Sequence, residues 1–166
     1  NAGSKIEFTR KVEQKGRVAV LGAGPAGMSC ALFLAQKGVH VDLFDKTSIP
    51  GGVPSSSLPS FRLHDRAIKL DIQRILKAGI HFQVKNFADW NKDDFASYDA
   101  VFIGLGLEDS PMMKLSGSSL KGLYSSIQFL EKMRKGELSE IQPEHIFVVG
   151  GGNTAMDCAI SAKYAW

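Results

Sequence analysis

A glycine-rich turn at residues 22–27 is the first feature of this 166-residue sequence that could bind a ligand. It reads Gly-Ala-Gly-Pro-Ala-Gly, follows a short apolar run and precedes a segment with helical apolar spacing. In a strand–turn–helix of this kind the first glycine allows the tight bend, the second lets a pyrophosphate approach the backbone, and the third lets helix and strand pack closely. N–H groups at the helix start then point at the phosphates. The turn therefore predicts a dinucleotide site.

An acidic residue at the end of the next strand is the second part of this pattern, because it accepts a hydrogen bond from a ribose hydroxyl. Asp45 follows the apolar run at residues 41–44 and lies 18 residues after Gly27. The alternative is a tight turn between a strand and a helix that binds no ligand. Such a turn would not need the acid, so the combination favours a dinucleotide.

Two further glycine pairs indicate which dinucleotide this is. Gly51-Gly52 comes soon after the acid, and a later apolar strand ends in Gly104-Leu105-Gly106. Both features are typical of FAD-binding members of the two-dinucleotide flavoprotein class, and domains that bind only NAD do not need them. On its own, Gly51-Gly52 also fits a plain turn beside Pro50.

The chain contains the same strand–turn–helix motif twice, since residues 17–31 align without gaps with residues 145–159. The second turn has alanine at the third glycine position, an allowed variant, and consists of Gly150, Gly151, Gly152, Asn153, Thr154 and Ala155. We expect Asn153 and Thr154 to donate hydrogen bonds near a phosphate. Asp157 is expected to make a contact on its helix face or between domains. The sequence ends before a further strand, so NAD and NADP both remain open, as does a truncated unit that binds nothing.

The elements between the two turns alternate as in α/β proteins. Strands are expected at residues 39–44, 80–84 and 100–103, the last one buried, and helices at 63–78, 89–97 and 127–134, with a long loop at 46–62. The predicted fold is α/β, a Rossmann-like FAD-binding parallel sheet with the beginning of a second, truncated Rossmann-like NAD(P)-binding domain. The predicted parts are an N-terminal extension (1–16), the FAD-binding domain (17–107), a connection (108–144) and the start of the NAD(P)H-binding domain (145–166).

Composition excludes several other classes. The net charge is only +3 and is evenly spread, so neither nucleic acid nor a membrane surface is an expected partner. No apolar run approaches the roughly 20 residues of a membrane span, and a cytoplasmic location is expected. The two cysteines and four histidines lack metal-ligand spacing, so we expect no metal site. Cys30, Cys158, Met28 and Met156 are expected in the core.

The series of motifs resembles a known family from about residue 17 to residue 162. It comprises the first glycine turn, Asp45-Lys46, Gly51-Gly52, Leu58-Pro59-Ser60-Phe61-Arg62-Leu63, Ile103-Gly104-Leu105-Gly106 and the second glycine turn followed by Met156-Asp157. It is similar to the FAD- and NADPH-binding electron-entry module shared by dihydropyrimidine dehydrogenase and the small subunit of glutamate synthase. Residues 29–35, the serines before Leu58, residues 103–107 and residues 157–159 look most similar to dihydropyrimidine dehydrogenase. The second glycine turn and residues 121–125 are as similar to the small subunit of glutamate synthase.

The resemblance implies roles for individual residues. The FAD pyrophosphate would be held by Gly22, Ala23, Gly24, Pro25, Ala26 and Gly27, with Asp45 and Lys46 beside the ribose. The approach to the flavin would be lined by Gly51, Gly52 and Val53, with Gly106 after the later strand, Arg62 as a fixed cation beside the cofactor, and Ala88 near the adenine through its backbone. The NADPH phosphates would be taken by Gly150, Gly152, Asn153, Thr154 and Ala155.

The function implied by the resemblance is electron transfer from NADPH to FAD and on to iron–sulfur clusters. The clusters, and an iron–sulfur domain or subunit that carries them, would lie outside this chain, and a homo-oligomer is compatible with the sequence. Pyrimidine reduction, as in dihydropyrimidine dehydrogenase, is slightly favoured over glutamate synthesis. Because the resemblance places no substrate-reducing residues in this segment, no catalytic residue is nominated, and we expect the chain to be incomplete and inactive alone. A non-catalytic nucleotide-binding fragment is the remaining alternative.

Overall fold

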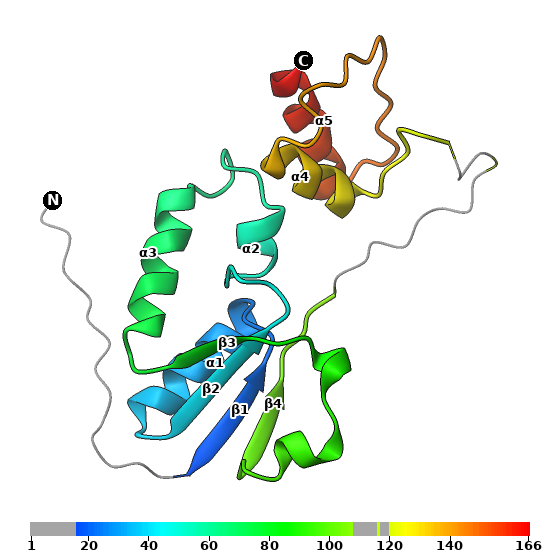
Figure 1. The fold of residues 1–166 in the computed structure, drawn as a ribbon. Helices are drawn as coiled ribbons and strands as arrows, with labels where there is room; N and C mark the ends of the chain where they lie inside the picture. Colours follow the sequence, from blue (N-terminus) through cyan, green and yellow to red (C-terminus); the bar gives the residue numbers. More distant parts are fainter. Residues whose placement is uncertain (1–15, 108–115, 117–119) are drawn as a thin grey trace, which may run out of the picture. The chain divides into compact units, whose positions relative to one another are not determined.

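The computed structural model describes residues 16–107, 116 and 120–166 (Figure 1). The described residues divide into two compact units: residues 16–55 with 64–106 form unit 1, and residues 56–63 with 107, 116 and 120–166 form unit 2. Most of the predicted N-terminal extension, and residues 108–115 and 117–119 of the predicted connection (108–144), lie outside the described residues. The two units are taken in turn.

Unit 1 is built on a four-stranded parallel sheet with the order β3-β2-β1-β4 (Figure 1). Its strands are β1 (Arg17–Leu21), β2 (His40–Asp45), β3 (His81–Val84) and β4 (Ala100–Ile103), and each neighbouring pair runs parallel. The chain crosses from β1 to β2 and β3 on one side and then returns to β4 on the other side of β1. The strand order therefore reverses between β1 and β4, which is where open α/β sheets bind ligands, outside the carboxyl ends of the strands.

One face of the sheet packs against α1 (Pro25–Gln36) and α3 (Asp65–Leu76). Helix α1 begins directly after the glycine turn, with extended backbone at Gly24 and a proline at its first position, whose fixed φ suits a helix start. Its buried face consists of Gly27, Met28, Ala31 and Ala35. Because these side chains are mostly small, α1 lies close to β1.

The other face is covered by the segment between β3 and β4. The expected helix at 89–97 is wrong: the chain forms two 3₁₀ helices, Phe87–Asp89 and Lys92–Phe95. Each follows an asparagine whose side chain accepts a backbone N–H, and such caps favour short turns. Trp90, Phe95 and Tyr98 pack on Ala19, Leu21 and Phe44 of the sheet. The segment is therefore a cover of aromatic side chains.

Strand β4 differs from the prediction in its burial. It was expected to be buried, but all four of its residues are exposed, Ile103 with 64% of its surface. The reason lies in its position, because β4 is the last strand on its side of the sheet in the part of the chain that the structure describes.

Unit 2 contains α4 (Ser126–Lys135) packed on α5 (Asn153–Ala165). The loop expected at 46–62 contains a short helix, α2 (Val53–Ser56), at the point where the chain passes from unit 1 to unit 2. The strand implied before the second glycine turn is absent from the described residues. Residues 145–149 stay irregular and Phe147 is 87% exposed, since no other strand pairs with this segment.

Core predictions for the sulfur-containing residues hold for three of four side chains. Met28 and Cys158 are buried, and Cys30 is half-buried against the core of unit 1. Met156 is 52% exposed, so its prediction is wrong. It lies on the side of α5 away from the buried Asp157, Cys158 and Ala162. Within the described part of the chain, no helix combines the length and the hydropathy needed to cross a bilayer.

Candidate nucleotide-binding site

The first and third glycines of the turn at 22–27 are required by close packing. Gly22 has φ +97°, a conformation that side chains other than glycine's rarely adopt, and its N–H donates to Phe44 O at 2.7 Å. A Cβ on Gly22 would overlap the backbone of Gly104, and a Cβ on Gly27 would overlap the carbonyl of Gly22. These two positions therefore hold α1, β1 and the end of β4 together at backbone distance.

Gly24 has a different role, because its backbone would accept a side chain. Its φ is −74°, and a Cβ placed on it would meet only Gly52 Cα, at 4.0 Å. It is the N-cap of α1, and no side chain caps the helix. The N–H groups of the first turn are thus left without a side-chain acceptor, in the arrangement by which helix N-termini bind phosphates.

The structure brings Gly51-Gly52 against the first glycine turn. Gly51 N donates to Ala23 O at 2.7 Å, and a Cβ on Gly52 would lie 2.9 Å from Gly24 Cα. Gly52 also has φ +59°. The two turns together form a surface of bare backbone in front of the N-terminus of α1. Hereafter this surface, made by Ala23, Gly24, Gly51 and Gly52, is called the glycine cradle.

Asp45 closes one side of the glycine cradle. Its Oδ2 accepts from Ala23 N at 2.8 Å, and its Oδ1 accepts from the N and the Oγ1 of Thr47, both at 2.9 Å. A carboxylate has about four lone-pair positions, so these three bonds leave it able to accept one more. The expected hydrogen bond from a ribose hydroxyl is compatible with this geometry. Sequence reasoning missed Thr47, whose signal is the aspartate two residues before it, a common turn-forming spacing.

Gly104 also belongs to this site, whereas Gly106 was the residue nominated. Gly104 N donates to Leu21 O at 2.7 Å, and a Cβ on Gly104 would lie 3.4 Å from Gly27 N. A Cβ on Gly106 would have open space around it. The signal for Gly104 is its place directly after β4, where the strand end must pass the first glycine turn.

Three other nominated residues of unit 1 are described by their position and exposure. Lys46 is exposed directly after Asp45, and Val53 is 45% exposed at the start of α2. Ala88 is exposed, and its N–H donates to Asn86 Oδ1 at 3.1 Å. Their predicted cofactor contacts stay predictions.

The second glycine turn lies in unit 2 and has the same form of helix start. Gly150 has φ +135°, and Gly152 is the N-cap of α5 with no side-chain cap. A Cβ on Gly152 would have open space around it. Asn153 and Thr154 are exposed, as their predicted contacts with a phosphate require. Pro25 and Ala26 occupy the equivalent first helical positions of α1.

Arg62 is placed in unit 2 as well. Its Nε donates to Asp157 Oδ1 at 2.6 Å, so the partner of Asp157 is a residue from the segment 56–63. The contact expected for Asp157 on its helix face or between domains is thus an ion pair with Arg62 within unit 2. Arg62 has four further N–H groups on its terminal nitrogens, and its predicted place beside a cofactor stays a prediction.

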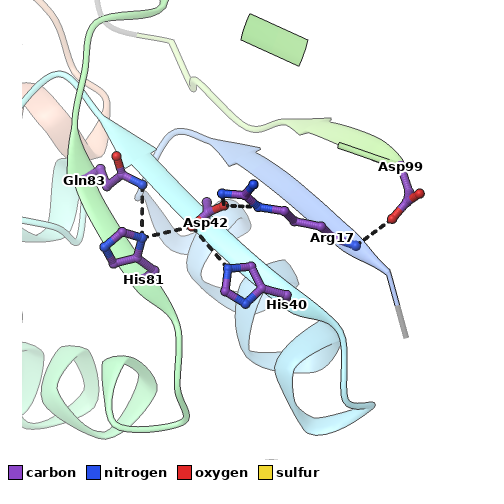
Figure 2. Close-up of polar contacts among 6 residues, drawn as sticks. All are labelled: Arg17, His40, Asp42, His81, Gln83 and Asp99. Atoms are coloured by element: carbon purple, nitrogen blue, oxygen red, sulfur yellow. Dashed lines mark hydrogen bonds and ion pairs between the residues drawn. The ribbon is translucent and has the colours of Figure 1, made fainter. Parts of the chain in front are cut away.

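A second polar cluster surrounds Asp42 of β2, with Arg17 from β1 and His81 from β3 (Figure 2). Asp42 has no exposed surface; its Oδ2 accepts from Arg17 Nε at 2.8 Å, and its Oδ1 lies 3.0 Å from His81 Nδ1 and 3.5 Å from His40 Nε2. Burial raises the pKa of Asp42, but the hydrogen bonds from His81, Arg17 and Tyr98 together lower it by more than burial raises it. The pKa of Asp42 is therefore below its usual value. Among the described residues, no group of three or more histidine, cysteine or acidic side chains is arranged to hold a metal ion.

With this geometry in place, the comparisons identify the family. The chain belongs to the pyridine nucleotide-disulphide oxidoreductase family, which it matches over residues 16–165. It is 35% identical over 161 residues to the beta subunit of NADP(+)-dependent formate dehydrogenase from Moorella thermoacetica, covering 94% of this chain and 23% of that one. It is 34% identical to the NADPH glutamate synthase small chain of Escherichia coli, covering 89% and 34%.

Two further similarities bear on the prediction. The chain is 30% identical to the NAD-dependent dihydropyrimidine dehydrogenase subunit PreT of Escherichia coli, covering 89% of this chain and 36% of that one. A structure of Mycobacterium tuberculosis FprA in complex with NADPH matches the fold with a TM-score of 0.68 at 19% identity, covering 88% and 36%. The chain thus spans from about a quarter to just over a third of the length of these relatives.

The comparisons confirm the predicted class, a family of FAD- and NADPH-dependent oxidoreductases, and the Rossmann-like α/β fold. Both predicted enzyme families occur among the relatives, and the identities do not separate them. The relatives are themselves described as subunits or chains of larger enzymes.

Proposed function

We propose that this chain is the FAD-binding and NADPH-binding entry portion of a flavoprotein oxidoreductase, which passes electrons from NADPH to FAD and on to iron–sulfur clusters. The observation that carries the proposal is the glycine cradle. Ala23-Gly24 of the first turn and Gly51-Gly52 of the second face each other at the uncapped N-terminus of α1, beside the Asp45 carboxylate at the end of β2. The site stands where the strand order of the sheet reverses, which supports a dinucleotide ligand.

The residues present fit FAD in three respects. A Cβ at Gly24 or Gly52 would occupy the cradle, so the lack of side chains there leaves room for a pyrophosphate. The first N–H groups of α1 would bind its oxygens, and Asp45 would accept from the ribose. When bound, FAD would accept a hydride from a reduced nicotinamide and release electrons one at a time. The second glycine turn would bind the nicotinamide dinucleotide at the start of α5.

The final substrate would be bound and reduced by parts of the enzyme outside this chain. Pyrimidine reduction and glutamate synthesis are both supported by relatives of similar identity, so the proposal covers the shared electron-entry step. The partner that receives the electrons is proposed to be an iron–sulfur domain or subunit, and the location to be the cytoplasm. Cysteine clusters in the flanking gene sequence, together with a flavin-dependent barrel downstream, would support the pyrimidine enzyme.

The test is FAD binding by the purified chain and by Gly24→Val. We expect the parent chain to bind FAD and to absorb at about 450 nm. In the full-length enzyme this absorbance should bleach when NADPH is added. Gly24→Val should abolish FAD retention, because its side chain would fill the glycine cradle, while circular dichroism stays unchanged since φ at Gly24 suits any residue.

The matched control is Gly151→Val, at a glycine of unit 2 around which a Cβ has open space. It should bind FAD like the parent chain. A folded parent that takes up no FAD would leave the non-catalytic fragment as the better description. Equal FAD affinity in parent and Gly24→Val would remove the glycine cradle as the site.

A further inference from the structure

We propose that Arg62 and Asp157 are positioning residues for the nicotinamide dinucleotide: their ion pair fixes helix α5, at whose start the dinucleotide would bind, to the segment 56–63. The inference rests on the proposed function and extends it, since it assigns a specific task to two side chains. It also gives Arg62 a task besides the predicted one of a cation beside the cofactor.

The first observation is the burial of Asp157. This carboxylate lies four residues after Asn153, in the second turn of α5, and only 10% of its side chain is exposed. A buried carboxylate is costly unless it is paired and hydrogen-bonded. Arg62 supplies the charge and the donor at 2.6 Å, so removing either partner leaves the other without its counter-charge. The side chain of Arg62 is 46% exposed and therefore tolerates that loss better.

The second observation is that the same segment is held at another point. Arg134 Nη1, from α4, donates to Leu58 O at 2.7 Å. Between the two contacts the chain turns at Pro59, whose carbonyl accepts from Arg62 N at 2.9 Å. Ser57 is 1% exposed. Segment 56–63 is thus anchored to α4 through a main-chain carbonyl and to α5 through an ion pair.

The third observation is where the segment stands in the chain. Its neighbours on both sides, ending at Ser55 and resuming at His64, belong to unit 1, yet the segment itself belongs to unit 2. It begins four residues after Gly52 of the glycine cradle. The ion pair therefore joins the start of the nicotinamide helix to the stretch of chain that directly follows the FAD turn.

The consequence concerns the N–H groups at the start of α5. They would bind phosphate only if the helix holds its place, because a shift of about 1 Å can cost a hundredfold in a positioned site. Helix α5 has no side-chain cap of its own, and the strand expected before its turn is absent from the described residues. The Arg62–Asp157 pair is therefore a contact that orients this helix independently of its own turn.

The experiment compares binding of NADPH and of FAD in Arg62→Gln, Asp157→Asn and the reversed pair Arg62→Asp with Asp157→Arg. We expect each single variant to weaken NADPH binding about tenfold, measured by titration of nicotinamide fluorescence, while FAD affinity changes less than twofold. The reversed pair should recover most of the loss, and Arg62→Lys should fall between parent and Arg62→Gln, because lysine keeps the charge without the fork.

Lys132→Gln is the matched control, since Lys132 forms its ion pair, at 2.8 Å, with Glu137 of the same unit. It should bind NADPH like the parent chain. Hydrogen exchange without ligand adds a second readout: amides in the first two turns of α5 should exchange faster in Asp157→Asn but not in Lys132→Gln.

The outcomes separate the two proposals. A parent chain that binds NADPH while both single variants bind it within twofold overturns the positioning role alone. Equal losses of FAD and NADPH affinity, or no recovery in the reversed pair, overturn it as well, because they indicate general destabilisation. A parent that binds no NADPH overturns both this inference and the second cofactor site, whereas failure to bind FAD counts against the proposed function only.

Discussion

At the scale of single residues, Asp42 shows how a buried charge is made stable within a sheet. Its carboxylate lies on the face covered by Tyr98 and is paired with Arg17 and His81 (Figure 2). The cluster belongs to the strand that ends in Asp45, three residues later, yet it makes none of the hydrogen bonds that form the glycine cradle. Its effect is therefore expected on stability rather than on cofactor binding.

The stability of unit 1 should depend on pH through Asp42. Because its folded pKa lies below the usual value, the pairing stabilises the fold above that value and is lost as pH falls through the folded pKa. Asp42→Asn should lower the free energy of unfolding at pH 7 by about 1.5–3 kcal/mol, the size of a hydrogen bond to a charged group. Urea unfolding measured from pH 3 to pH 7 should then show that the free energy of unfolding rises less with pH in Asp42→Asn than in the parent chain. A parallel pH profile in both would contradict this assignment.

The glycines of the first turn should separate stability from binding. Gly27→Ala should lower the free energy of unfolding by about 1–3 kcal/mol, since its Cβ overlaps the carbonyl of Gly22 and the helix must move. Gly151→Ala serves as the control because its Cβ would have open space around it. Thermal unfolding followed by circular dichroism measures both variants, and equal midpoints would show that α1 can shift at no cost.

The sequence allowed most of this site to be predicted at residue scale, because glycines and an acid at fixed spacing have few other uses. Asp45, the glycine turn at 22–27 and Gly51-Gly52 were nominated in this way, and the structure brings them together. Thr47 was not nominated, and after β4 the sequence nominated Gly106 in place of Gly104, since their parts depend on which segments come together in space: Gly104 matters only because β4 ends beside Gly27.

At the scale of elements, the exposed edge of β4 is expected to promote self-association. Parallel strand β4 has a neighbour on one side only among the described residues, and its side chains are apolar and exposed. Unpaired edges of this kind act as templates for another strand. Ile103→Lys should therefore reduce association of the isolated chain, measured by light scattering, and change the unfolding free energy by less than about 0.5 kcal/mol.

Phe33→Lys is the control for that variant. Phe33 is 60% exposed, close to the 64% of Ile103, but lies on α1, where the backbone groups are already paired within the helix. It should leave association unchanged. The prediction fails if the two substitutions reduce scattering equally, because apolar exposure alone would then be responsible.

Hydrophobic patterns predicted whether a helix or strand exists better than they predicted its burial and its neighbours. The apolar runs at 100–103 and 145–149 look alike in sequence, yet one is an exposed edge strand and the other is not a strand. A strand exists only beside a partner, and the pattern of one segment does not reveal whether a partner is present. At 89–97 the aromatic residues serve as a cover, and asparagine caps shorten the helices that polar residues suggested.

At the scale of the whole molecule, the two units should unfold separately. Unit 1 has a sheet with buried clusters on both faces, whereas the buried apolar side chains of unit 2 among the described residues are Leu130, Leu138, Cys158 and Ala162. The chain has two tryptophans, Trp90 in unit 1 and Trp166 in unit 2. Fluorescence of Trp90→Phe, which keeps Trp166, should therefore report a lower urea midpoint than that of Trp166→Phe.

Far-ultraviolet circular dichroism of the same samples provides the control, since it records both transitions at once. Coincident midpoints for the two fluorescence probes would mean that the chain unfolds as one cooperative body. Sequence reasoning could not assign segment 56–63 to unit 2, because the assignment depends on Arg62 meeting a residue 95 positions away.

The double passage of the backbone between the units also limits how such proteins can be rearranged. A unit joined to its host by one linker could be exchanged between enzymes by a single recombination event. Here residues 56–63 would be left behind in the host, and an incoming unit would meet an arginine without its aspartate. Successful chimaeras should therefore have inherited the octapeptide together with the distant helix that it contacts.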